Sequence, residues 1–389
     1  MSQRATPKVA IVHYWFVAER GGEKVVRALC DLYPQAVLFA HVADRALCER
    51  LFPGHEVRTS FISRLPFARR FYQSYLPLMP LALEMLDLQE FDLVLSSESG
   101  PAKGVIPNPG AAHVCYCHSP MRYLWDHFHL YRANAGFLAK ATMPFLAHRL
   151  RQWDAASADR VDAFVANSTF VAQRIRKYYR REAVVAPPPV DIGFFRRESR
   201  DADPSLADSF LWVGQLVPYK RPDLAVRAAV ECGLRLIVIG EGELSRALAN
   251  EAGTGVEFWG RADAETLARA YRSCRALIFP GEEDFGIVPV EAMASGLPVI
   301  AFGRGGALDT VSDGETGLLF EDQTVDSLVA AIRRFQSVEP QFDRDRIALQ
   351  AHAFDASAFR KKIIEIVDAT IAANAAARVQ GPSPLASGV

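Results

Sequence analysis

Short apolar segments recur along the chain, and their spacing constrains the fold more than any other feature. In the first half they read VAIVHYWF at 9–16, FDLVLSS at 91–97, AAHVCYC at 111–117 and DAFVANS at 162–168. Each is too short for a buried helix and is followed by a helix-like or loop sequence. Strands of this kind, alternating with helices, predict parallel βαβ units in which both faces of the sheet are covered.

The same alternation restarts in the second half, after a segment rich in proline and charge at 186–209. Further apolar segments follow at 210–216, 235–242, 256–260, 276–284 and 298–306. The sequence therefore predicts an α/β fold of two doubly wound, Rossmann-like domains that face a central cleft. Ligands on such sheets bind at the carboxyl ends of the strands.

These restarts also predict the domain boundaries. We expect an N-terminal domain at 1–190, a linker at 191–209 and a C-terminal domain at 210–350. A helical segment at 351–377 is expected to return to the N-terminal domain, and the tail at 378–389 is expected to be disordered. A chain of 389 residues has room for two such domains.

Composition argues against several classes of protein. The formal net charge of -1 provides no overall field that would attract nucleic acid. Six cysteines in a chain of this length do not form a disulfide framework. The N-terminus lacks a secretory apolar core, and the apolar runs are shorter than the ~20 residues that cross a bilayer. We therefore expect a cytoplasmic protein without a nucleic-acid partner.

The segment GEEDFGIVPVEAMASGLPVIA, at 281–301, carries the strongest chemical signal. An acidic loop follows an apolar strand, and a helix is predicted to run from Gly286 to Ser295. The unpaired N–H groups at the start of this helix, from Gly286, Ile287 and Val288, suit a phosphate group.

Two carboxylates flank this helix start. Glu291 lies about one turn into the helix, where it can accept hydrogen bonds from the hydroxyls of a ribose. Glu283, in the preceding loop, can reach sugar hydroxyls beyond the phosphate. An isolated pair of glutamates at this spacing is usually a solvated loop, but the surrounding strand, loop and helix favour a nucleotide-sugar site.

The same segment resembles the signature of the retaining glycosyltransferases of family 4, which have the GT-B fold. The resemblance covers nearly the whole chain and includes RGGEKV, FVANSTFVAQRI, APPPVD, GQLVPYKRPDLAV, IGEGE and FWGR. HYWFVAERGGEKV, TSFISRLPF, YLPLMPLALE and CYCHSPMRYLWD look more narrowly like a bacterial branch that contains mannosyltransferases of O-antigen and exopolysaccharide synthesis. The resemblance implies a GDP-mannose donor and a glycan acceptor on a lipid carrier. None of these motifs requires a metal or another cofactor.

The resemblance also assigns roles to individual residues. Lys220 would hold the diphosphate, but the arginine that the family usually carries in this loop is Gln215 here, a neutral amide that adds no charge. Lys220 then carries more of the load, or Arg221 contributes, or activity is reduced. His118 would reach the donor sugar from the first domain, so His118, Glu283 and Lys220 are the expected catalytic residues. Further expected donor-binding positions are Gly21, Gly22, Gly240, Trp259 and Phe285.

Two patterns suggest a metal site but fall short of one. Cys115 and Cys117 share one face of a predicted strand, and with His118 they supply fewer ligands than structural zinc requires. We expect these cysteines to pack as small apolar side chains. The Asp-x-Asp sequences at 201–203 and 343–345 follow no buried strand and are interpreted as solvated charge.

Competing functions stay open at this point. A dinucleotide-dependent enzyme would need a third glycine after Gly240 and Gly242, but Ser245 stands there. Other GT-B enzymes share the predicted fold, among them a UDP-sugar transferase, a sugar-nucleotide epimerase and a glycan phosphorylase. The alternative from a different class is a non-catalytic glycan- or nucleotide-binding protein, which Gln215 favours.

The segment Thr59–Leu86 interleaves arginine with aromatic residues, leucine and proline. This pattern suits a surface that meets anionic headgroups or a lipid-linked acceptor, at the inner membrane for example. It is equally typical of a packed helical insertion with a few surface arginines. The sequence leaves both interpretations open.

Overall fold

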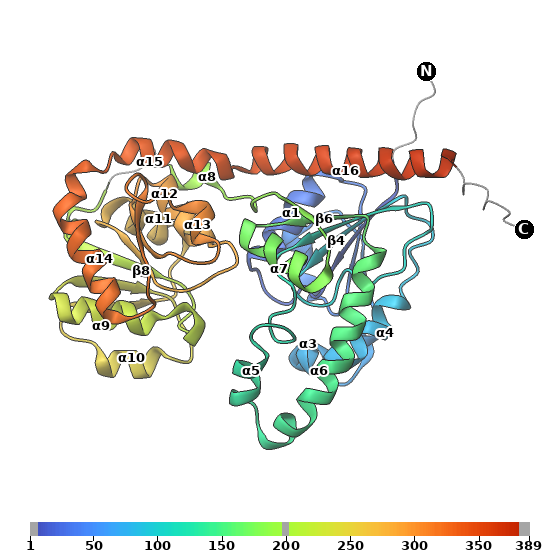
Figure 1. Cartoon of the computed structure of the whole chain (residues 1–389), viewed down its shortest axis with the longest axis horizontal. Helices are drawn as coiled ribbons and strands as arrows, with labels where there is room; N and C mark the ends of the chain where they lie inside the picture. Colours follow the sequence, from blue (N-terminus) through green and yellow to red (C-terminus); the bar gives the residue numbers. More distant parts are fainter. Residues whose placement is uncertain (1–6, 197–201, 381–389) are drawn as a thin grey trace, which may run out of the picture. The chain divides into compact units, whose positions relative to one another are not determined.

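The computed structural model describes residues 7–196 and 202–380. The chain divides into two compact units (Figure 1). The first contains the chain up to Ala186 together with the segment from Phe359 onward, and the second is Pro187–Ala358.

The first unit is built on a seven-stranded sheet with the order β3-β2-β1-β4-β5-β6-β7, in which neighbouring strands are parallel. Its strands are β1 Val9–His13, β2 Val37–Ala40, β3 Val57–Thr59, β4 Leu93–Glu98, β5 Ala112–Cys117, β6 Ala163–Ala166 and β7 Ala183–Val185. Its α-helices are α1 Gly21–Leu32, α2 Arg45–Leu51, α3 Ala68–Phe71, α4 Met79–Glu84, α5 Phe128–Asn134, α6 Phe137–Ser157, α7 Thr169–Tyr179 and α16 Ala356–Gln380. The chain order reverses between β1 and β4.

Alternate residues of these strands point into two cores on opposite faces of the sheet. Val9 and Ile11 of β1 pack on the face that α1 and α16 cover. Ala10 packs on the other face, where Cys115 and Cys117 of β5 lie under α7. Because both faces are buried, the strands carry apolar residues at successive positions rather than at every second one.

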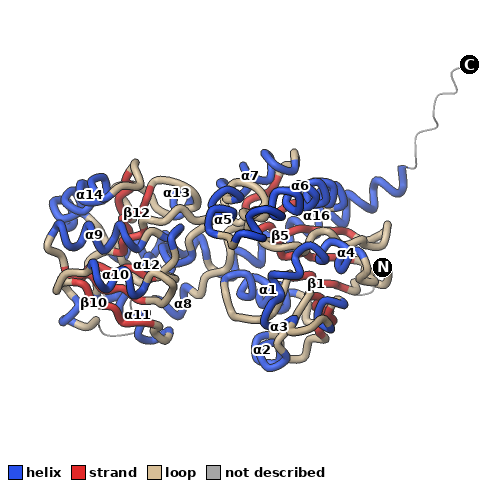
Figure 2. Tube along the Cα trace, turned by 90° about the horizontal axis from the view of Figure 1, so that it is seen from below, coloured by secondary structure: helices blue, strands red, loops and turns tan. Residues whose placement is uncertain are grey.

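The second unit repeats this plan with a six-stranded parallel sheet of order β10-β9-β8-β11-β12-β13 (Figure 2). Its strands are β8 Ser209–Val213, β9 Arg235–Ile239, β10 Val256–Gly260, β11 Leu277–Phe279, β12 Val299–Phe302 and β13 Gly317–Phe320. Its α-helices are α8 Ile192–Phe195, α9 Pro222–Cys232, α10 Ser245–Glu251, α11 Ala264–Ser273, α12 Ile287–Ala294, α13 Ala307–Thr310, α14 Val325–Val338 and α15 Arg344–Ala351. The order reverses between β8 and β11.

Both sheets confirm the predicted fold class, an α/β fold with two doubly wound, Rossmann-like sheets. In the second unit, α9 and α14 cover one face, and α11, α12 and α15 cover the other. The cleft expected between the domains stays a prediction.

The segments at the predicted boundaries have structure of their own. The expected linker at 191–209 includes α8, whose Ile192 and Phe195 side chains are buried in the core of the second unit. The Ser295 hydroxyl of the loop after α12 donates to the Phe195 carbonyl oxygen at 2.8 Å. The part of 191–209 that only connects the two units is therefore shorter than its proline and charge content suggested, because the apolar residues of α8 pack in the core of the second unit.

The final helix, α16, extends three residues past the predicted end at 377. Phe359, Ile363, Ile366 and Val367 of this helix lie in the core cluster of the first unit. Residues 381–389 of the expected tail lie outside the described residues, as does Asp201 of the first Asp-x-Asp sequence.

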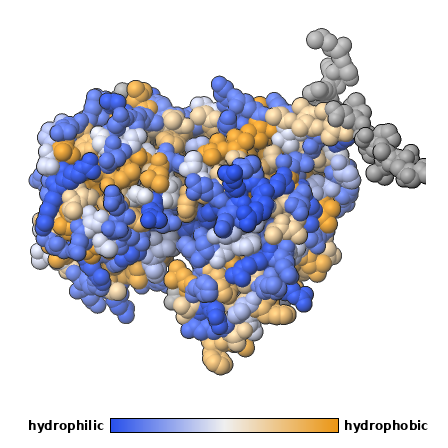
Figure 3. Space-filling model, in the orientation of Figure 1, coloured by the Kyte–Doolittle hydropathy of each residue, from blue (hydrophilic) through white to orange (hydrophobic). Residues whose placement is uncertain are grey.

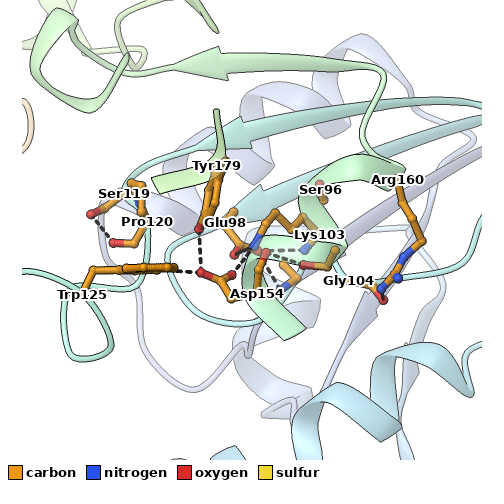
Figure 4. Close-up of polar contacts among 12 residues, drawn as sticks. Ser96, Glu98, Lys103, Gly104, Ser119, Pro120, Trp125, Asp154, Arg160 and Tyr179 are labelled. Carbon is orange, nitrogen blue, oxygen red and sulfur yellow. Dashed lines mark hydrogen bonds and ion pairs between the residues drawn. The ribbon is translucent and has the colours of Figure 1, made fainter. Parts of the chain in front are cut away.

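A buried ammonium group ties several segments of the first unit together (Figure 4). Lys103 Nζ lies 3.1 Å from Glu98 Oε1 and also contacts Asp154 Oδ1, and all three side chains are fully buried. Asp154 accepts two further hydrogen bonds, from Trp125 Nε1 at 2.8 Å and from the Tyr179 hydroxyl at 3.0 Å. These contacts join the end of β4 to the last turns of α6 and α7.

The charges in this cluster depend on one another. Burial raises the pKa of Glu98, against the charge of Lys103 and with a further rise from Asp154. Burial disfavours the charge of Lys103, yet Asp154 and Glu98 together raise its pKa above the ordinary value. The backbone N–H groups of Ala102 and Lys103 each donate to Glu98 Oε2 at 2.8 Å. Lys103 is therefore the cation that allows two carboxyl groups to share the interior.

Lys103→Met should destabilise the chain strongly, because Glu98 and Asp154 would then face each other without a cation. Breaking a buried ion pair by removing one partner costs about 3–5 kcal/mol. Urea unfolding measures this loss. The matched control is Lys8→Met, which removes one partner of the exposed Lys8–Glu90 pair at 3.2 Å and should change the unfolding free energy by less than about 1 kcal/mol. Equal losses in the two variants would contradict the role of Lys103.

Candidate functional site

In the second unit, the loops that follow β8 and β11 meet where the strand order reverses. Lys220 ends the 3-10 turn Pro218–Lys220 in the first loop, and Glu283 lies in the second. Lys220 Nζ donates to Glu283 Oε1 at 2.7 Å. The side chains keep 15% and 20% of their surface exposed, so a ligand can reach the pair from solvent. The fold thus brings together two of the three residues expected to be catalytic.

Backbone contacts from neighbouring loops fix this pair. A Cβ atom on Gly281 would lie 2.9 Å from Lys220 Cα, so glycine permits the close approach of the two loops. The loop after β12 supports Glu283 from another side, because the Gly306 N–H donates to the Glu283 carbonyl oxygen at 2.8 Å. The Glu283 carboxylate is therefore held on a rigid backbone rather than on a free loop.

The helix predicted at Gly286–Ser295 is confirmed as α12, Ile287–Ala294. Gly286 precedes it with a φ of 86°, in the left-handed region that glycine favours. Gly286 has no side chain with which to cap this helix, so the first N–H groups, including those of Ile287 and Val288, need a partner other than an N-cap side chain. A phosphate group would meet that need.

Two side chains of this region are less exposed than the sequence suggested. Glu291 is buried and accepts a hydrogen bond from the Tyr271 hydroxyl of α11 at 3.2 Å. Burial, followed by the charge of Glu291, raises the pKa of Tyr271 well above its ordinary value. The Phe285 side chain packs in the core, with its ring 5.7 Å from that of Phe354. A donor contact at Phe285 is therefore limited to its backbone.

The structure bears on which cation could act in place of the family arginine that Gln215 replaces. Gln215 is exposed in the loop after β8. Arg221 is engaged elsewhere, because it pairs with Asp223 at 2.9 Å and donates to Gln323 Oε1 at 3.2 Å. Within this loop, Lys220 is the cation that is aimed at Glu283.

The other expected donor positions lie at the ends of β9 and β10. The Gly240 N–H donates to the Gly260 carbonyl oxygen at 2.8 Å, and a Cβ atom on Gly240 would lie 1.8 Å from Gly214 O. Gly240 is therefore required for packing between loops, whether or not it meets a donor. Trp259 is half-buried against the core, and its Nε1 donates to Glu257 at 3.4 Å.

In the first unit, polar side chains of β1 and β4 contact each other at the point where the strand order reverses. Ser97 Oγ, on β4, lies 3.0 Å from His13 Nδ1 and 2.8 Å from His118 Nε2. His13 ends β1, and His118 directly follows β5. On its other side, His13 Nε2 lies 3.8 Å from Glu23 Oε1 of α1. The motifs HYWFVAERGGEKV and RGGEKV contain Glu23, and the first begins at His13, but no role was predicted for either residue or for Ser97. His13 nevertheless stands at a strand end, where ligands of such sheets bind.

The direction of proton donation in this network depends on the tautomers of its two histidines. A proton on His13 Nε2, on the side of the Glu23 carboxylate, would leave Nδ1 to accept from the Ser97 hydroxyl. Ser97 Oγ can then accept from a proton on His118 Nε2. We infer that His118 Nδ1 carries a lone pair and can accept a hydrogen bond from a hydroxyl group.

Gly21 and Gly22 begin α1, where the sequence places a helix start. A Cβ atom on Gly22 would lie 2.8 Å from the Tyr14 hydroxyl and 3.1 Å from His13 Cε1. Glu23 also accepts from the Arg20 N–H at 2.9 Å, as part of a capping box. Gly22 therefore allows α1 to start directly against the end of β1.

Burial, with a smaller effect from His13, lowers the pKa of His118 to about 3. The imidazole is consequently neutral near pH 7. Cys115 and Cys117 are fully buried, which confirms them as packing residues, and burial raises the pKa of both thiols. Within residues 7–196 and 202–380, no group of three or more His, Cys, Asp or Glu side chains is placed to hold a metal ion.

Two family models match the chain. The model described as Glycosyltransferase Family 4 matches residues 19–194. The model described as Glycosyl transferases group 1 matches residues 201–350. Together the two matches extend over most of both units.

Curated relatives are similar over about half of their length. D-inositol 3-phosphate glycosyltransferase of Segniliparus rotundus is 32% identical over 209 residues, which is 46% of each chain. The protein of the same name from Nocardiopsis dassonvillei is 30% identical over 249 residues, 57% of each chain. The chain thus spans about half the length of the curated relatives it matches.

Solved structures are similar over nearly the whole chain. Anabaena Alr3699/HepE in complex with UDP and glucose has a TM-score of 0.68 at 18% identity, covering 93% of this chain and 100% of that one. Sucrose-phosphate synthase from Thermosynechococcus elongatus has a TM-score of 0.70 at 18% identity, covering 95% and 100%. WaaG, a glycosyltransferase involved in lipopolysaccharide biosynthesis, has a TM-score of 0.64 at 16% identity, covering 92% and 99%. At these identities the likeness establishes the GT-B fold.

The pH dependence of unfolding should report the burial of His118. Its pKa is about 3 in the folded chain and ~6.5 in an unfolded one. The unfolded chain binds more protons between these values, so this contribution is fully present above pH ~6.5 and is lost as the pH falls toward ~3. Going from pH ~7 to pH ~5 should cost about 2 kcal/mol at this position.

Urea unfolding of the wild type and His118→Gln at the two pH values measures this difference. The variant should lose less stability on acidification than the wild type. His41 and His113, whose pKa values burial lowers to about 4, contribute equally to both proteins. The control His129→Gln replaces an exposed histidine and should behave like the wild type. The same acid sensitivity in His118→Gln and the wild type would contradict a partly buried, neutral His118.

Proposed function

We propose that this chain, which belongs to family 4 of the glycosyltransferases and has the GT-B fold, transfers a sugar from a nucleotide donor to a glycan acceptor with retention at the anomeric carbon. The observation that carries this proposal is the contact between Lys220 Nζ and Glu283 Oε1 at 2.7 Å. It joins a cation suited to a diphosphate and a carboxylate suited to sugar hydroxyls at one strand-order reversal.

In the proposed reaction, Lys220 stabilises the negative charge that develops on the departing diphosphate. The free N–H groups at the start of α12 bind the same phosphate groups. Glu283 orients the donor sugar through its hydroxyls, and Glu291 accepts from the ribose. Because Gln215 is neutral and Arg221 is engaged with Asp223, Lys220 carries most of the side-chain charge stabilisation in this loop.

The first unit supplies His118 on the acceptor side. With its Nδ1 free to accept, His118 would bind a hydroxyl of the donor sugar. The attack and the departure take place on the same face of the sugar, and an oxygen of the leaving phosphate removes the proton from the attacking acceptor hydroxyl. This route needs no covalent enzyme nucleophile and no metal ion.

The donor we favour is GDP-mannose, and the acceptor is a growing bacterial surface polysaccharide, such as an O-antigen or exopolysaccharide, on a lipid carrier at the cytoplasmic face of the membrane. The resemblance of HYWFVAERGGEKV and CYCHSPMRYLWD to the mannosyltransferase branch supports this choice. A UDP-sugar is the second candidate, because a similar structure was solved with UDP-glucose. The name of the curated relatives favours an inositol phosphate acceptor instead.

Turnover should depend on the Lys220–Glu283 pair. With a polyprenyl-diphosphate-linked glycan as acceptor, release of GDP from GDP-mannose and of UDP from UDP-glucose are measured in parallel. Glu283→Gln and Lys220→Met should each lower kcat about 100-fold or more with the accepted donor, because each loses a group that acts on developing charge or on the bound sugar. His118→Ala should also lower kcat, whereas Cys115→Ala should lower mainly the thermal stability.

The matched controls are Arg227→Gln and Glu251→Gln, which break an exposed ion pair of 2.9 Å in the same unit. These variants should keep wild-type turnover. Turnover by Glu283→Gln at the wild-type rate would contradict the assignment of Glu283 to the donor site. Donor binding without release of either nucleotide would favour the non-catalytic binding protein.

A further inference from the structure

The helical pair α5–α6 carries strongly exposed apolar side chains at its tip. Phe137 and Leu138, at the start of α6, keep 92% and 76% of their surface exposed. Phe145, about two turns later in the same helix, keeps 64%. Nearby, Phe67 at the start of α3 keeps 75%. In Figure 1, α3, α4, α5 and α6 gather at the lower end of the first unit, and Figure 3 shows hydrophobic atoms at that end beside hydrophilic ones. Large side chains this exposed mark a surface that meets a partner.

The charge of the same two segments has a single sign. From Val57 to Leu83 and from His127 to Trp153 the sequence contains no Asp or Glu. Each of these stretches contains four basic residues, which are Arg58, Arg64, Arg69 and Arg70 in the first and Arg132, Lys140, Arg149 and Arg151 in the second. In a chain whose net charge is -1, basic residues are thus concentrated in these two segments.

Not all of these cations are equally available. Arg69 is paired with Asp44, and Arg58 with Glu56 and Glu90. Lys140 and Arg149 are exposed on α6, and Arg149 lies over the Phe145 ring at 5.4 Å. Lys140 and Arg149 are therefore basic groups of α6 on the same helix as its exposed aromatic rings, and Arg149 stands directly beside one of them.

The two segments are held together by packing. Leu76, from the turn between α3 and α4, packs in the cluster that α5 and α6 form around Met121 and Phe128. Trp153 Nε1 donates to Glu84 Oε1 of α4 at 2.9 Å. One turn of α6 carries Asp154, which is anchored by Lys103. The helix that carries the exposed tip, α6, is thus fixed to the rest of the first unit by contacts near its C-terminal end.

We propose that this surface, formed by Phe137, Leu138 and Phe145 with Lys140 and Arg149, docks the protein on an anionic lipid bilayer. Its aromatic and leucine side chains would enter the headgroup boundary, while the cations meet lipid phosphates. The absence of acidic residues over both stretches favours a bilayer over a second copy of the chain, because two such surfaces would repel each other. Among the described helices, none is long and apolar enough to cross a membrane, so contact here would be peripheral.

This docking deepens the proposed function and rests on it in one respect: a lipid-linked acceptor is presented at a bilayer surface. Vesicle binding can nevertheless be measured without sugar transfer. A chain that fails to bind vesicles but transfers sugar to a water-soluble glycan would retain the proposed function and lose the docking surface. The reverse result would leave the docking surface intact.

The test is co-sedimentation of the full chain with vesicles of phosphatidylcholine alone and of an equal mixture with phosphatidylglycerol. The wild type should bind the anionic vesicles about tenfold or more tightly than the neutral ones, and added salt should weaken the binding. Phe137→Ser/Leu138→Ser/Phe145→Ser should weaken binding to anionic vesicles about tenfold or more. Lys140→Gln/Arg149→Gln should reduce the preference for anionic over neutral vesicles.

The matched control is Leu349→Ser/Val230→Ser, which removes two exposed apolar side chains from the second unit and should bind vesicles like the wild type. Wild-type binding by the triple variant, or no binding of the wild type to anionic vesicles, would overturn the proposal. A wild type that is dimeric without lipid, with a monomeric triple variant, would assign the surface to a second copy instead. If the triple variant proves unfolded, the charge variant alone decides, because its side chains are on the surface.

Discussion

The reversal of strand order beside the first strand of each sheet is the constraint on which the polar cluster of each unit depends. In a doubly wound sheet, the crossover helices on the two sides of the reversal cover opposite faces, so the loops at this point are left open at the carboxyl edge. In the second unit these are the loops after β8 and β11, which carry Lys220 and Glu283. In the first unit β1 and β4 bring His13 and Ser97 together.

The electrostatics of these two polar clusters differ in kind. The second unit exposes a charged pair, Lys220 and Glu283, in which each group serves as the counterion of the other until a ligand competes for it. A diphosphate would take over the ammonium group and release the carboxylate to bind sugar hydroxyls. The first unit instead holds a neutral imidazole, His118, in a partly buried network where charge is disfavoured. In the proposed reaction, Lys220 would offer charge to the leaving group, and His118 would offer an uncharged hydrogen-bond acceptor.

Much of the fold could be predicted from the sequence, because strands buried on both faces read as continuous apolar runs and helix ends carry glycine signals. The bounds of α12 and the burial of Cys115 and Cys117 followed from such local rules. The partners of the site residues could not be predicted in this way. His13 and Ser97 are 84 positions apart, and Tyr271 reaches Glu291 from another helix. Only the topology of the sheets brings these side chains into contact.

The same distinction explains where local interpretation fell short. Proline and charge marked 191–209 as a linker, but the apolar side chains of α8 find a place in the core of the second unit. Arg221 is one option for replacing the missing family arginine, and its pairing with Asp223 could not be predicted from the sequence. Composition indicates which residues are polar or apolar, whereas the partner that each one meets is decided by tertiary packing.

The central claim is retaining transfer of a sugar from a nucleotide donor, and the configuration of the product tests it most directly. The full chain is incubated with GDP-mannose and a polyprenyl-diphosphate-linked glycan, and the new glycosidic linkage is examined by NMR through the coupling at its anomeric carbon. The account predicts an α-linked mannose, with the configuration of the donor kept. A β-linked product, or release of GDP without any new linkage, would contradict it.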